Sequence, residues 1–392
     1  MTKVRMGMVG GGPDAFIGQV HRMAAGLDGN IELVCGVFSR DQQKNRQAGE
    51  SLLADPARAY ADIASLFAAE QKLPAEQRME FVSIVTPNSS HHAIASAAID
   101  AGFHVFCEKP ATFTLAESVD LQRQLQTSPV LFGLAHTYTG YPLVKEARQR
   151  VANGELGEIK KVVVEYSQGW LAKKLNNQTS KQGSWRLDPT YAGVSCCVGD
   201  IGVHAANLAE YIIDSPIKQI LADLGSVEAD RSLDDDATVL LRFANQARGV
   251  LIASQISLGE ENNLNIKVYG SQGSLSWSQQ EPNSLWLMSG DQPAQLLRTG
   301  FDYLCDQAKQ CTRTPAGHPE GYIEAFANLY QAFANGVKQH RNNPVKDSRV
   351  EGVPDIEHAV SGMQFIEGTV TSSQANNSWL KLDKLTPAEH TK

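Results

Sequence analysis

The sequence predicts an α/β protein of two domains: a parallel sheet covered by helices, then an α+β domain with an open, mainly antiparallel sheet. Two patterns carry this prediction. Up to about residue 135, strands that are apolar on both faces alternate with helices, as in a sheet buried on both sides. From about 216 to 290, short strands of alternating polarity are separated by turn residues at intervals near ten. A length of 392 residues fits about two domains, which we expect at 1–135 and 136–392.

The elements of the first domain follow from its apolar runs and its glycines and prolines. Pro87 and Pro110 end the strands in which they lie, since proline has no amide hydrogen for a sheet. Gly102 closes a helix, as glycine often does. Strands are expected at 3–10, 30–39, 80–88, 103–110 and 129–136, and helices within 11–27, 40–54, 61–70, 89–102 and 114–126.

The second domain is predicted from the change in periodicity. A polar loop at 171–193 precedes a helix at 197–212. Further helices are expected at 142–154, 319–340 and 355–374, and strands at 158–170, 217–229, 236–245, 247–257, 263–271 and 273–279.

Composition excludes several classes of function. The net charge of −8, without a Lys/Arg-rich run, argues against binding to nucleic acid. No apolar run approaches the roughly 18 residues of a membrane span, and the N-terminus lacks the pattern of a signal peptide. Six cysteines occur without a CxxC pair, so we expect neither a metal site nor a disulfide framework. The sequence therefore predicts a cytoplasmic globular protein with reduced cysteines.

A glycine-rich turn follows the first predicted strand. Gly10 and Gly12 begin a G-x-G-x-x-A pattern with Ala15 in the third position, and Gly18 comes slightly later. Gly10 allows the tight turn, and Gly12 lets the backbone approach a pyrophosphate at the helix N-terminus. Glycine clusters also make ordinary turns, but the strand–turn–helix context favours a dinucleotide-binding Rossmann domain.

The end of the second strand leaves the choice of cofactor open. An acidic residue usually binds the adenosine ribose there, but this chain has Ser39 and Arg40. These two residues are able to accommodate a 2′-phosphate, while a solvated arginine is the alternative. The cofactor is therefore predicted as NAD or NADP.

Two further strand ends carry polar residues. "CEKP" places Lys109 at the carboxyl end of a strand, where ligands of parallel sheets bind, and Pro110 favours an extended backbone before it. "TPNSSHH" places Thr86, Asn88 and His91 at the end of the neighbouring strand, within reach of a nicotinamide. A surface lysine and a helix cap are the alternatives.

The segment "CVGDIGVHAANLAEYI" places Asp200 and His204 four residues apart. On an α-helix these positions share one face, so both side chains are expected in one pocket. Gly199 and Gly202 are expected to leave that turn open to a ligand. The alternative is an aspartate cap with a packed histidine.

The motifs "GMVGGG", "IVTPNSSHHAIASAAIDAGFHVFCEKP", "SWRLDP" and "GDIGVH", in this order, resemble the Gfo/Idh/MocA family over nearly the whole chain. The segments "WRLDP" and "AGHPEGYIEAFANLY" look most like the branch of this family that contains levoglucosan dehydrogenase. The resemblance implies catalytic roles for Lys109, Asp200 and His204. Glu108 is predicted to bind the cofactor. The resemblance also implies a homodimer or homotetramer formed through the open sheet. The family's glycine-rich run is replaced here by "GVSCCVG", which leaves the substrate's identity open.

These residues predict an NAD(P)-dependent dehydrogenase of a sugar, polyol or related cyclic alcohol. His204 suits the general base, Lys109 stabilises the alkoxide, and Asp200 orients a neighbouring hydroxyl. Trp185 and Arg186 are expected to line the sugar site. For these two, and for Trp170, His136, Tyr138, His318 and Tyr322, packing or capping is at least as plausible as contact with the substrate. The alternatives are an NAD-dependent glycoside hydrolase, a dinucleotide-sensing regulator and, less favoured, a zinc dehydrogenase, for which two side chains are too few ligands.

Overall fold

The computed structural model describes residues 3–13, 15–172, 186–227, 231–344 and 347–384. The chain forms two units: Met1–Gly140 with Ile323–Val360, and Tyr141–Tyr322 with Ser361–Lys392. This division differs from a single boundary at residue 135, because a late segment returns to the first unit.

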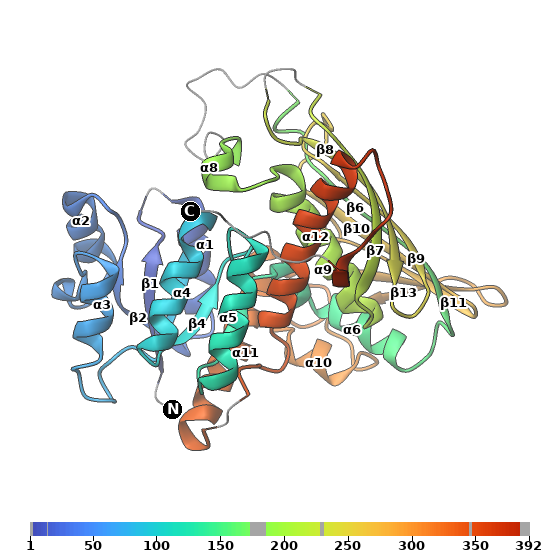
Figure 1. Cartoon of the computed structure of the whole chain (residues 1–392). Coiled ribbons are helices and arrows are strands. Elements are labelled where there is room, and N and C mark those ends of the chain that lie inside the picture. Colours follow the sequence, from blue (N-terminus) through green and yellow to red (C-terminus); the bar gives the residue numbers. More distant parts are fainter. Residues whose placement is uncertain (1–2, 14, 173–185, 228–230, 345–346, 385–392) are drawn as a thin grey trace. The chain divides into compact units, whose positions relative to one another are not determined.

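The first unit contains the predicted parallel sheet, with five strands in the order β2-β1-β3-β4-β5 (Figure 1). The strands are β1 (Val4–Gly10), β2 (Ile31–Val37), β3 (Phe81–Val85), β4 (His104–Cys107) and β5 (Phe132–Leu134). The helices between them are α1 (Phe16–Gly26), α2 (Gln42–Leu52), α3 (Ile63–Glu70), α4 (His91–Asp100) and α5 (Leu115–Thr127). Short 3-10 turns lie at η1 (Pro56–Arg58), η2 (Asn88–Ser90) and η3 (Thr137–Gly140).

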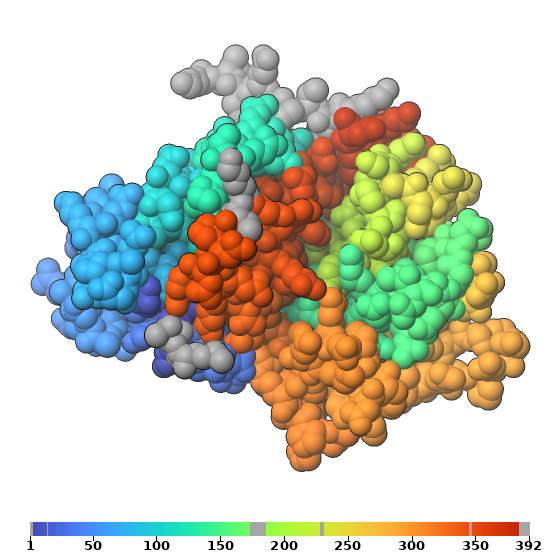
Figure 2. Space-filling model, turned by 90° about the horizontal axis from the view of Figure 1, so that it is seen from below, coloured from blue at the N-terminus to red at the C-terminus, as the bar shows by residue number. Residues whose placement is uncertain are grey.

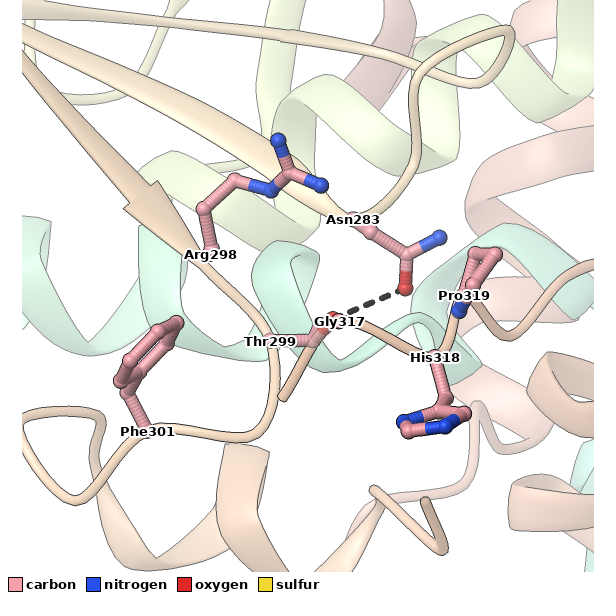
Figure 3. Close-up of a pocket in the computed structure, with 7 residues that line it drawn as sticks. All are labelled: Asn283, Arg298, Thr299, Phe301, Gly317, His318 and Pro319. Carbon is pink, nitrogen blue, oxygen red and sulfur yellow. Dashed lines mark hydrogen bonds between the residues drawn. The ribbon is translucent and has the colours of Figure 1, made fainter. Parts of the chain in front are cut away.

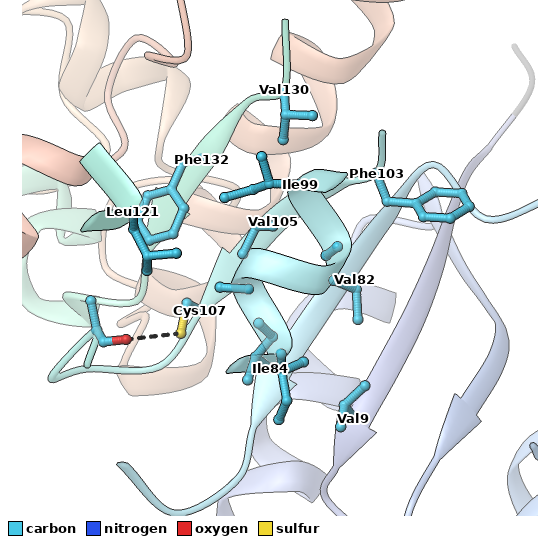
Figure 4. Packing of buried hydrophobic residues seen from close by; sticks show 14 of the residues in the cluster. Val9, Val82, Ile84, Ile99, Phe103, Val105, Cys107, Leu121, Val130 and Phe132 are labelled. Atoms are coloured by element: carbon cyan, nitrogen blue, oxygen red, sulfur yellow. Dashed lines mark hydrogen bonds between the residues drawn. The ribbon is translucent and has the colours of Figure 1, made fainter. Parts of the chain in front are cut away.

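The core of this unit lies between the sheet and its helices. All five residues of β3 are buried, which explains the continuous apolar run in the sequence. Figure 4 shows Val82, Ile84 and Val105 from adjacent strands packed with Ile99 and Leu121 from the covering helices. The sheet is therefore held by apolar burial, and its strand ends are available to carry polar groups.

Helix α11 (Tyr322–Asn342) explains why the first unit is discontinuous. Its Phe326, Tyr330 and Phe333 are at most 1% exposed. The Tyr330 ring lies 4.5 Å from that of Phe106, and the Phe333 ring 5.3 Å from that of Phe81. Figure 2 shows the orange-red surface of the returning segment beside the blue and cyan surface of the N-terminal residues. Burial of these aromatic rings gives α11 a place on the first sheet.

The second unit contains a nine-stranded sheet in the order β13-β12-β11-β10-β6-β9-β8-β7-β14. It is mainly antiparallel as predicted, but β6 and β9 pair in parallel. Its strands are β6 (Ile159–Ser167), β7 (Ile217–Gly225), β8 (Asp236–Phe243), β9 (Arg248–Ser254), β10 (Asn263–Gly270), β11 (Gly273–Ser278), β12 (Ser284–Ser289), β13 (Gln295–Arg298) and β14 (Leu380–Lys381). Strands β12, β13 and β14 were not predicted from the sequence.

Helices of the second unit are α6 (Pro142–Ala152), α8 (Pro189–Ala192), α9 (Val203–Ile213) and α10 (Asp306–Gln310), with a π-helical turn η4 (Val198–Gly202) before α9 and a 3-10 turn η5 (Leu382–Lys384). Helix α12 (Ile356–Gln374) begins in the first unit and continues into the second. Strand β8 alternates: Ala237, Val239 and Leu241 are buried, while Leu240 between them is 40% exposed. One sheet face is thus packed and the other faces outward. Among the described residues, no helix is long and apolar enough to cross a membrane.

Candidate active site

The predicted site residues are divided between the two units. In the first unit, the chain turns sharply after β1. Gly10 and Gly11 have φ angles of 85° and 66°, in the left-handed region that favours glycine. A Cβ at Gly10 would lie 2.7 Å from the Val85 carbonyl oxygen, and one at Gly12 would lie 3.0 Å from the Phe38 carbonyl oxygen. The backbone of this loop is therefore bare enough to approach a pyrophosphate.

The close approach of helix and loop depends on Gly18 and not on Ala15. A Cβ at Gly18 would lie 2.2 Å from the Gly11 Cα, a distance that no side chain can occupy. Ala15 instead occupies the N-cap of α1 and makes no side-chain capping bond. The third position of the fingerprint is thus occupied by Gly18, three residues after the predicted Ala15. Gly18 itself was the signal in the sequence.

After β2, an acidic residue, Asp41, directly follows Ser39 and Arg40. Arg40 is exposed, and the Ser39 hydroxyl accepts a hydrogen bond from the Asp41 amide at 3.1 Å. The Asp41 carboxylate caps α2, accepting from the amides of Gln43 and Lys44 at 2.9 and 3.0 Å. A carboxylate therefore stands beside the two residues predicted to receive a phosphate, and it occupies the amides at that helix N-terminus.

Lys109 follows the end of β4, as predicted. It is half-buried, and its peptide bond to Pro110 is cis. The Lys109 amide donates to Oε2 of Glu108 at 3.1 Å, and Oε1 of Glu108 lies 2.8 Å from Nε2 of His21. The Glu108 carboxylate is thus fixed by protein groups on both oxygens. The cofactor contact predicted for Glu108 stays a prediction.

His91 holds two loops together. Its ring is fully buried, with Nδ1 2.9 Å from the Pro110 carbonyl oxygen and Nε2 2.8 Å from the Thr86 carbonyl oxygen. Burial lowers the pKa of His91, and the two carbonyl partners oppose that shift. His91 therefore positions the segment around Lys109, and its contact with the cofactor stays a prediction. Thr86 accepts from the Ser90 hydroxyl at 2.8 Å, and Asn88 is 8% exposed.

His136 is buried just after β5, at 2% exposure. Burial lowers its pKa well below the usual value, and the charges of His358 and Lys109 lower it further. His136 is therefore an uncharged ring within the electrostatic reach of Lys109.

In the second unit, Asp200 and His204 lie at a helix start, but not on one regular α-helix. Asp200 is in the π-helical turn Val198–Gly202, and His204 is in the first turn of α9. Such turns are frequent at functional sites. A Cβ at Gly202 would lie 3.2 Å from Val198 Cγ1, so this glycine serves packing and not ligand approach, contrary to the prediction. A Cβ at Gly199 would meet no atom closer than 4.0 Å, as expected for an open position.

Two donors converge on the Asp200 carboxylate. Nε2 of Gln255 donates to Oδ2 at 3.1 Å, and Nε of Arg186 lies 3.2 Å from the same oxygen. Gln255 is fully buried and also accepts from the Cys196 thiol at 3.4 Å. Burial raises the pKa of Cys196, which keeps it a neutral thiol. Gln255 follows β9 and has no sequence signal, whereas the predicted Trp185 lies outside the described residues.

Asp234 holds the start of this helical segment. Its carboxylate accepts from the amides of Cys196 and Val198, both at 2.9 Å, and from the Ser195 hydroxyl at 3.0 Å. Burial raises the pKa of Asp234, and these three donors oppose the shift. The cap that the sequence analysis considered for Asp200 is therefore supplied by Asp234, which leaves Asp200 to bind other groups.

His204 lies against the sheet. It is 8% exposed, and its ring centroid is 6.3 Å from that of Tyr166, which donates its hydroxyl to Oδ1 of Asn262 at 2.7 Å. His204 is thus a nearly buried imidazole one turn beyond the anchored Asp200 carboxylate.

A separate cavity of about 220 Å³ lies in the second unit (Figure 3). It does not include Asp200 or His204. Within it, the Thr299 hydroxyl donates a hydrogen bond to Oδ1 of Asn283 at 2.9 Å. The polar candidate His318 lines this cavity. The lining residues are Asn283, Arg298, Thr299, Phe301, Gly317, His318 and Pro319.

Comparisons with known proteins match both units. A model described as an oxidoreductase family with an NAD-binding Rossmann fold matches residues 4–136, and one described as a GFO/IDH/MocA C-terminal domain matches residues 144–276. The uncharacterised oxidoreductase YfiI of Bacillus subtilis is 32% identical over 96% of both chains. Levoglucosan dehydrogenase of Pseudarthrobacter phenanthrenivorans is 26% identical over 98% of this chain and 100% of its own.

Among solved structures, an inositol dehydrogenase homologue from Azotobacter vinelandii is similar over almost the whole chain. Its NAD+ complex has a TM-score of 0.91 at 35% identity and covers 97% of both chains. Its complex with NADH and myo-inositol has a TM-score of 0.88 at 34% identity, covering 97% of this chain and 98% of the homologue. Identity is higher to this homologue than to levoglucosan dehydrogenase, toward whose branch the sequence motifs pointed.

Proposed function

Since this chain belongs to the Gfo/Idh/MocA family of oxidoreductases with an NAD-binding Rossmann domain, we propose that it oxidises a secondary alcohol of a cyclic polyol or sugar. The observation that carries this proposal is the anchored Asp200 carboxylate one turn before His204. Such a pair orients a hydroxyl and removes its proton, which is the protein's share of the reaction.

The first unit fits the dinucleotide. The positive φ angles of Gly10 and Gly11 and the close contacts around Gly12 make a loop that side chains would fill. We propose NAD as the preferred form, because the Asp41 carboxylate repels a 2′-phosphate and already binds the first amides of α2. Asp41→Ala should therefore raise kcat/KM with NADP about tenfold or more relative to NAD. If the ratio of kcat/KM between NADP and NAD is unchanged, Asp41 does not determine the cofactor preference.

Each catalytic group has one role. His204 accepts the hydroxyl proton in its neutral form. The Lys109 ammonium stabilises negative charge that develops in the transition state. Asp200 accepts a hydrogen bond from a neighbouring hydroxyl, which fixes the carbon that reacts. When bound, the nicotinamide accepts the hydride from that carbon.

The substrate class follows from the donors and acceptors around Asp200. Arg186, Gln255 and the carboxylate itself form a compact polar group that combines donors with an acceptor. Adjacent hydroxyls both donate and accept hydrogen bonds, so a vicinal diol matches this group better than an isolated alcohol does. The inositol dehydrogenase homologue solved with NADH and myo-inositol supports a cyclic polyol.

The test is a substrate panel of inositols, pyranoses, disaccharides and simple secondary alcohols with NAD or NADP, followed by absorbance of the reduced nicotinamide. We expect turnover with at least one cyclic polyol or pyranose, and none with isolated alcohols. Reduced cofactor should accumulate in proportion to product. Glycosidic cleavage without that accumulation would favour the hydrolase alternative, and inactivity on the whole panel would favour a regulator.

We also propose a homo-oligomer formed through the outward face of the second sheet. Leu240, Tyr269 and Trp286 lie on three of its strands and are 40%, 40% and 45% exposed. Large apolar residues spread over one sheet face are typical of a covered surface. Light scattering should give a dimer or tetramer, and Leu240→Glu should reduce its mass. A monomeric wild-type chain would contradict this proposal.

A further inference from the structure

His21 is a buried histidine to which the mechanism assigns no role. It lies on α1, directly after the glycine loop, and is 0% exposed. Nδ1 is 2.5 Å from the Tyr330 hydroxyl on α11, and Nε2 is 2.8 Å from Oε1 of Glu108 after β4. The Ser83 hydroxyl on β3 lies 2.8 Å from that of Tyr330. One buried network thus joins four elements of the first unit.

The hydrogen bonds of this network have a consistent direction. Burial raises the pKa of Tyr330, so its hydroxyl keeps its proton and donates to Nδ1 of His21. With Nδ1 accepting from Tyr330, Nε2 of His21 carries a proton and donates to Glu108. Ser83 donates in turn to the Tyr330 oxygen. Each member has the proton it needs, and the network ends on the Glu108 carboxylate.

Glu108 connects this network to the backbone of Lys109. Burial by itself raises the pKa of Glu108, but the hydrogen bond from His21 and the charge of Lys109 lower it overall. The carboxylate therefore stays ionised, with Oε1 facing His21 and Oε2 accepting the Lys109 amide at 3.1 Å. Loss of the contact with His21 removes the donor that fixes Oε1 of this carboxylate.

The same helix contacts the glycine loop. Arg22, next to His21, donates from Nη1 to the Gly11 carbonyl oxygen, and Gly18 packs on the Gly11 Cα. The loop that receives the pyrophosphate and the strand end that carries Lys109 are therefore linked through α1. Small displacements of a catalytic group cost large factors in rate.

We propose that His21 is a positioning residue for Lys109: it fixes the Glu108 carboxylate and, through the Lys109 amide, the strand end that carries the catalytic ammonium. This role rests on the proposed dehydrogenase function. It predicts that kcat depends on a side chain that touches neither cofactor nor substrate.

The test compares His21→Leu with His21→Gln in the full-length protein. Glutamine places an amide donor near the position of Nε2, whereas leucine removes both contacts. His92→Leu is the matched control, because His92 also pairs with a carboxylate, Asp120 at 2.9 Å, but on the surface of α4. The readouts are hydrogen exchange at the Lys109 amide, kcat, and KM for NAD.

His21→Leu should speed exchange at the Lys109 amide about tenfold and lower kcat about tenfold, the effect of losing one hydrogen bond to a charged group. KM for NAD should stay within about threefold, and His21→Gln should restore most of both losses. If His21→Leu does not fold, Tyr330→Phe keeps the ring packing and removes only the hydroxyl; faster exchange there supports the role.

Unchanged exchange at Lys109 in a folded His21→Leu protein would overturn the positioning role, and so would equal losses in His21→Leu and His21→Gln. The exchange measurement needs no turnover. A wild-type chain that is inactive on the substrate panel would therefore overturn the proposed function, while exchange would still decide whether His21 fixes the Lys109 segment.

Discussion

Removal of the Asp234 carboxylate should disturb both the stability of the second unit and its catalysis. In Asp234→Ala, the amides of Cys196 and Val198 and the Ser195 hydroxyl lose their common acceptor. Each buried donor left unsatisfied costs about 1–3 kcal/mol, and the relief from burying a carboxylate offsets part of the total. We therefore expect a loss of about 3 kcal/mol in the free energy of unfolding.

The catalytic effect follows from where the lost cap lies. The segment that Asp234 holds leads directly into the turn with Asp200 and the helix with His204, so kcat should fall about tenfold or more. The assays are urea unfolding and steady-state kinetics, with Asp236→Ala as the control from the same acidic run. Stability equal to that of the control would refute the capping argument. A destabilised enzyme with unchanged kcat would refute its link to the catalytic helix.

Three further predictions use single substitutions. Lys109→Met should lower kcat by about two orders of magnitude while NAD affinity changes less; near-wild-type turnover would leave Lys109 without a catalytic role. Asp200→Asn should raise the substrate KM and lower kcat together, and an unchanged KM would contradict its contact with the substrate. Burial, and to a smaller extent the charge of His340, lowers the pKa of His104 to about 3. The value in the unfolded chain is about 6.5. The contribution of His104 to stability is therefore complete above pH of about 6.5 and falls on acidification, by at most about 1.4 kcal/mol per pH unit. His104→Asn should flatten the loss of unfolding free energy between pH 7 and 5, and an unchanged slope would contradict this.

The sequence predicted the features that depend on local pattern. Apolar runs ended by Pro87 or closed by Gly102 marked the strands and helices of the first sheet. The glycine loop and Lys109 were also found, because both lie at strand ends where chain order alone fixes their place.

Features that depend on tertiary contacts were not predicted. Nothing in the local sequence indicates that α11 returns to the first sheet, since its aromatic face would pack equally well elsewhere. Gln255, Asp234 and His21 act on groups that lie between 36 and 87 positions away in the chain. The π-helical turn at Asp200 was assigned as regular helix, because a single extra residue per turn leaves the apolar pattern nearly unchanged.

The central claim is that His204 removes the substrate proton, and a pH–rate profile with saturating cofactor tests it most directly. Neutral imidazole accepts the proton, so alcohol oxidation by the wild-type enzyme should rise with pH through one apparent pKa and then level off. His204→Asn should lose that rise and most of kcat while it still binds NAD and remains folded. A His204→Asn enzyme with the wild-type rate and the wild-type pH dependence would contradict the account.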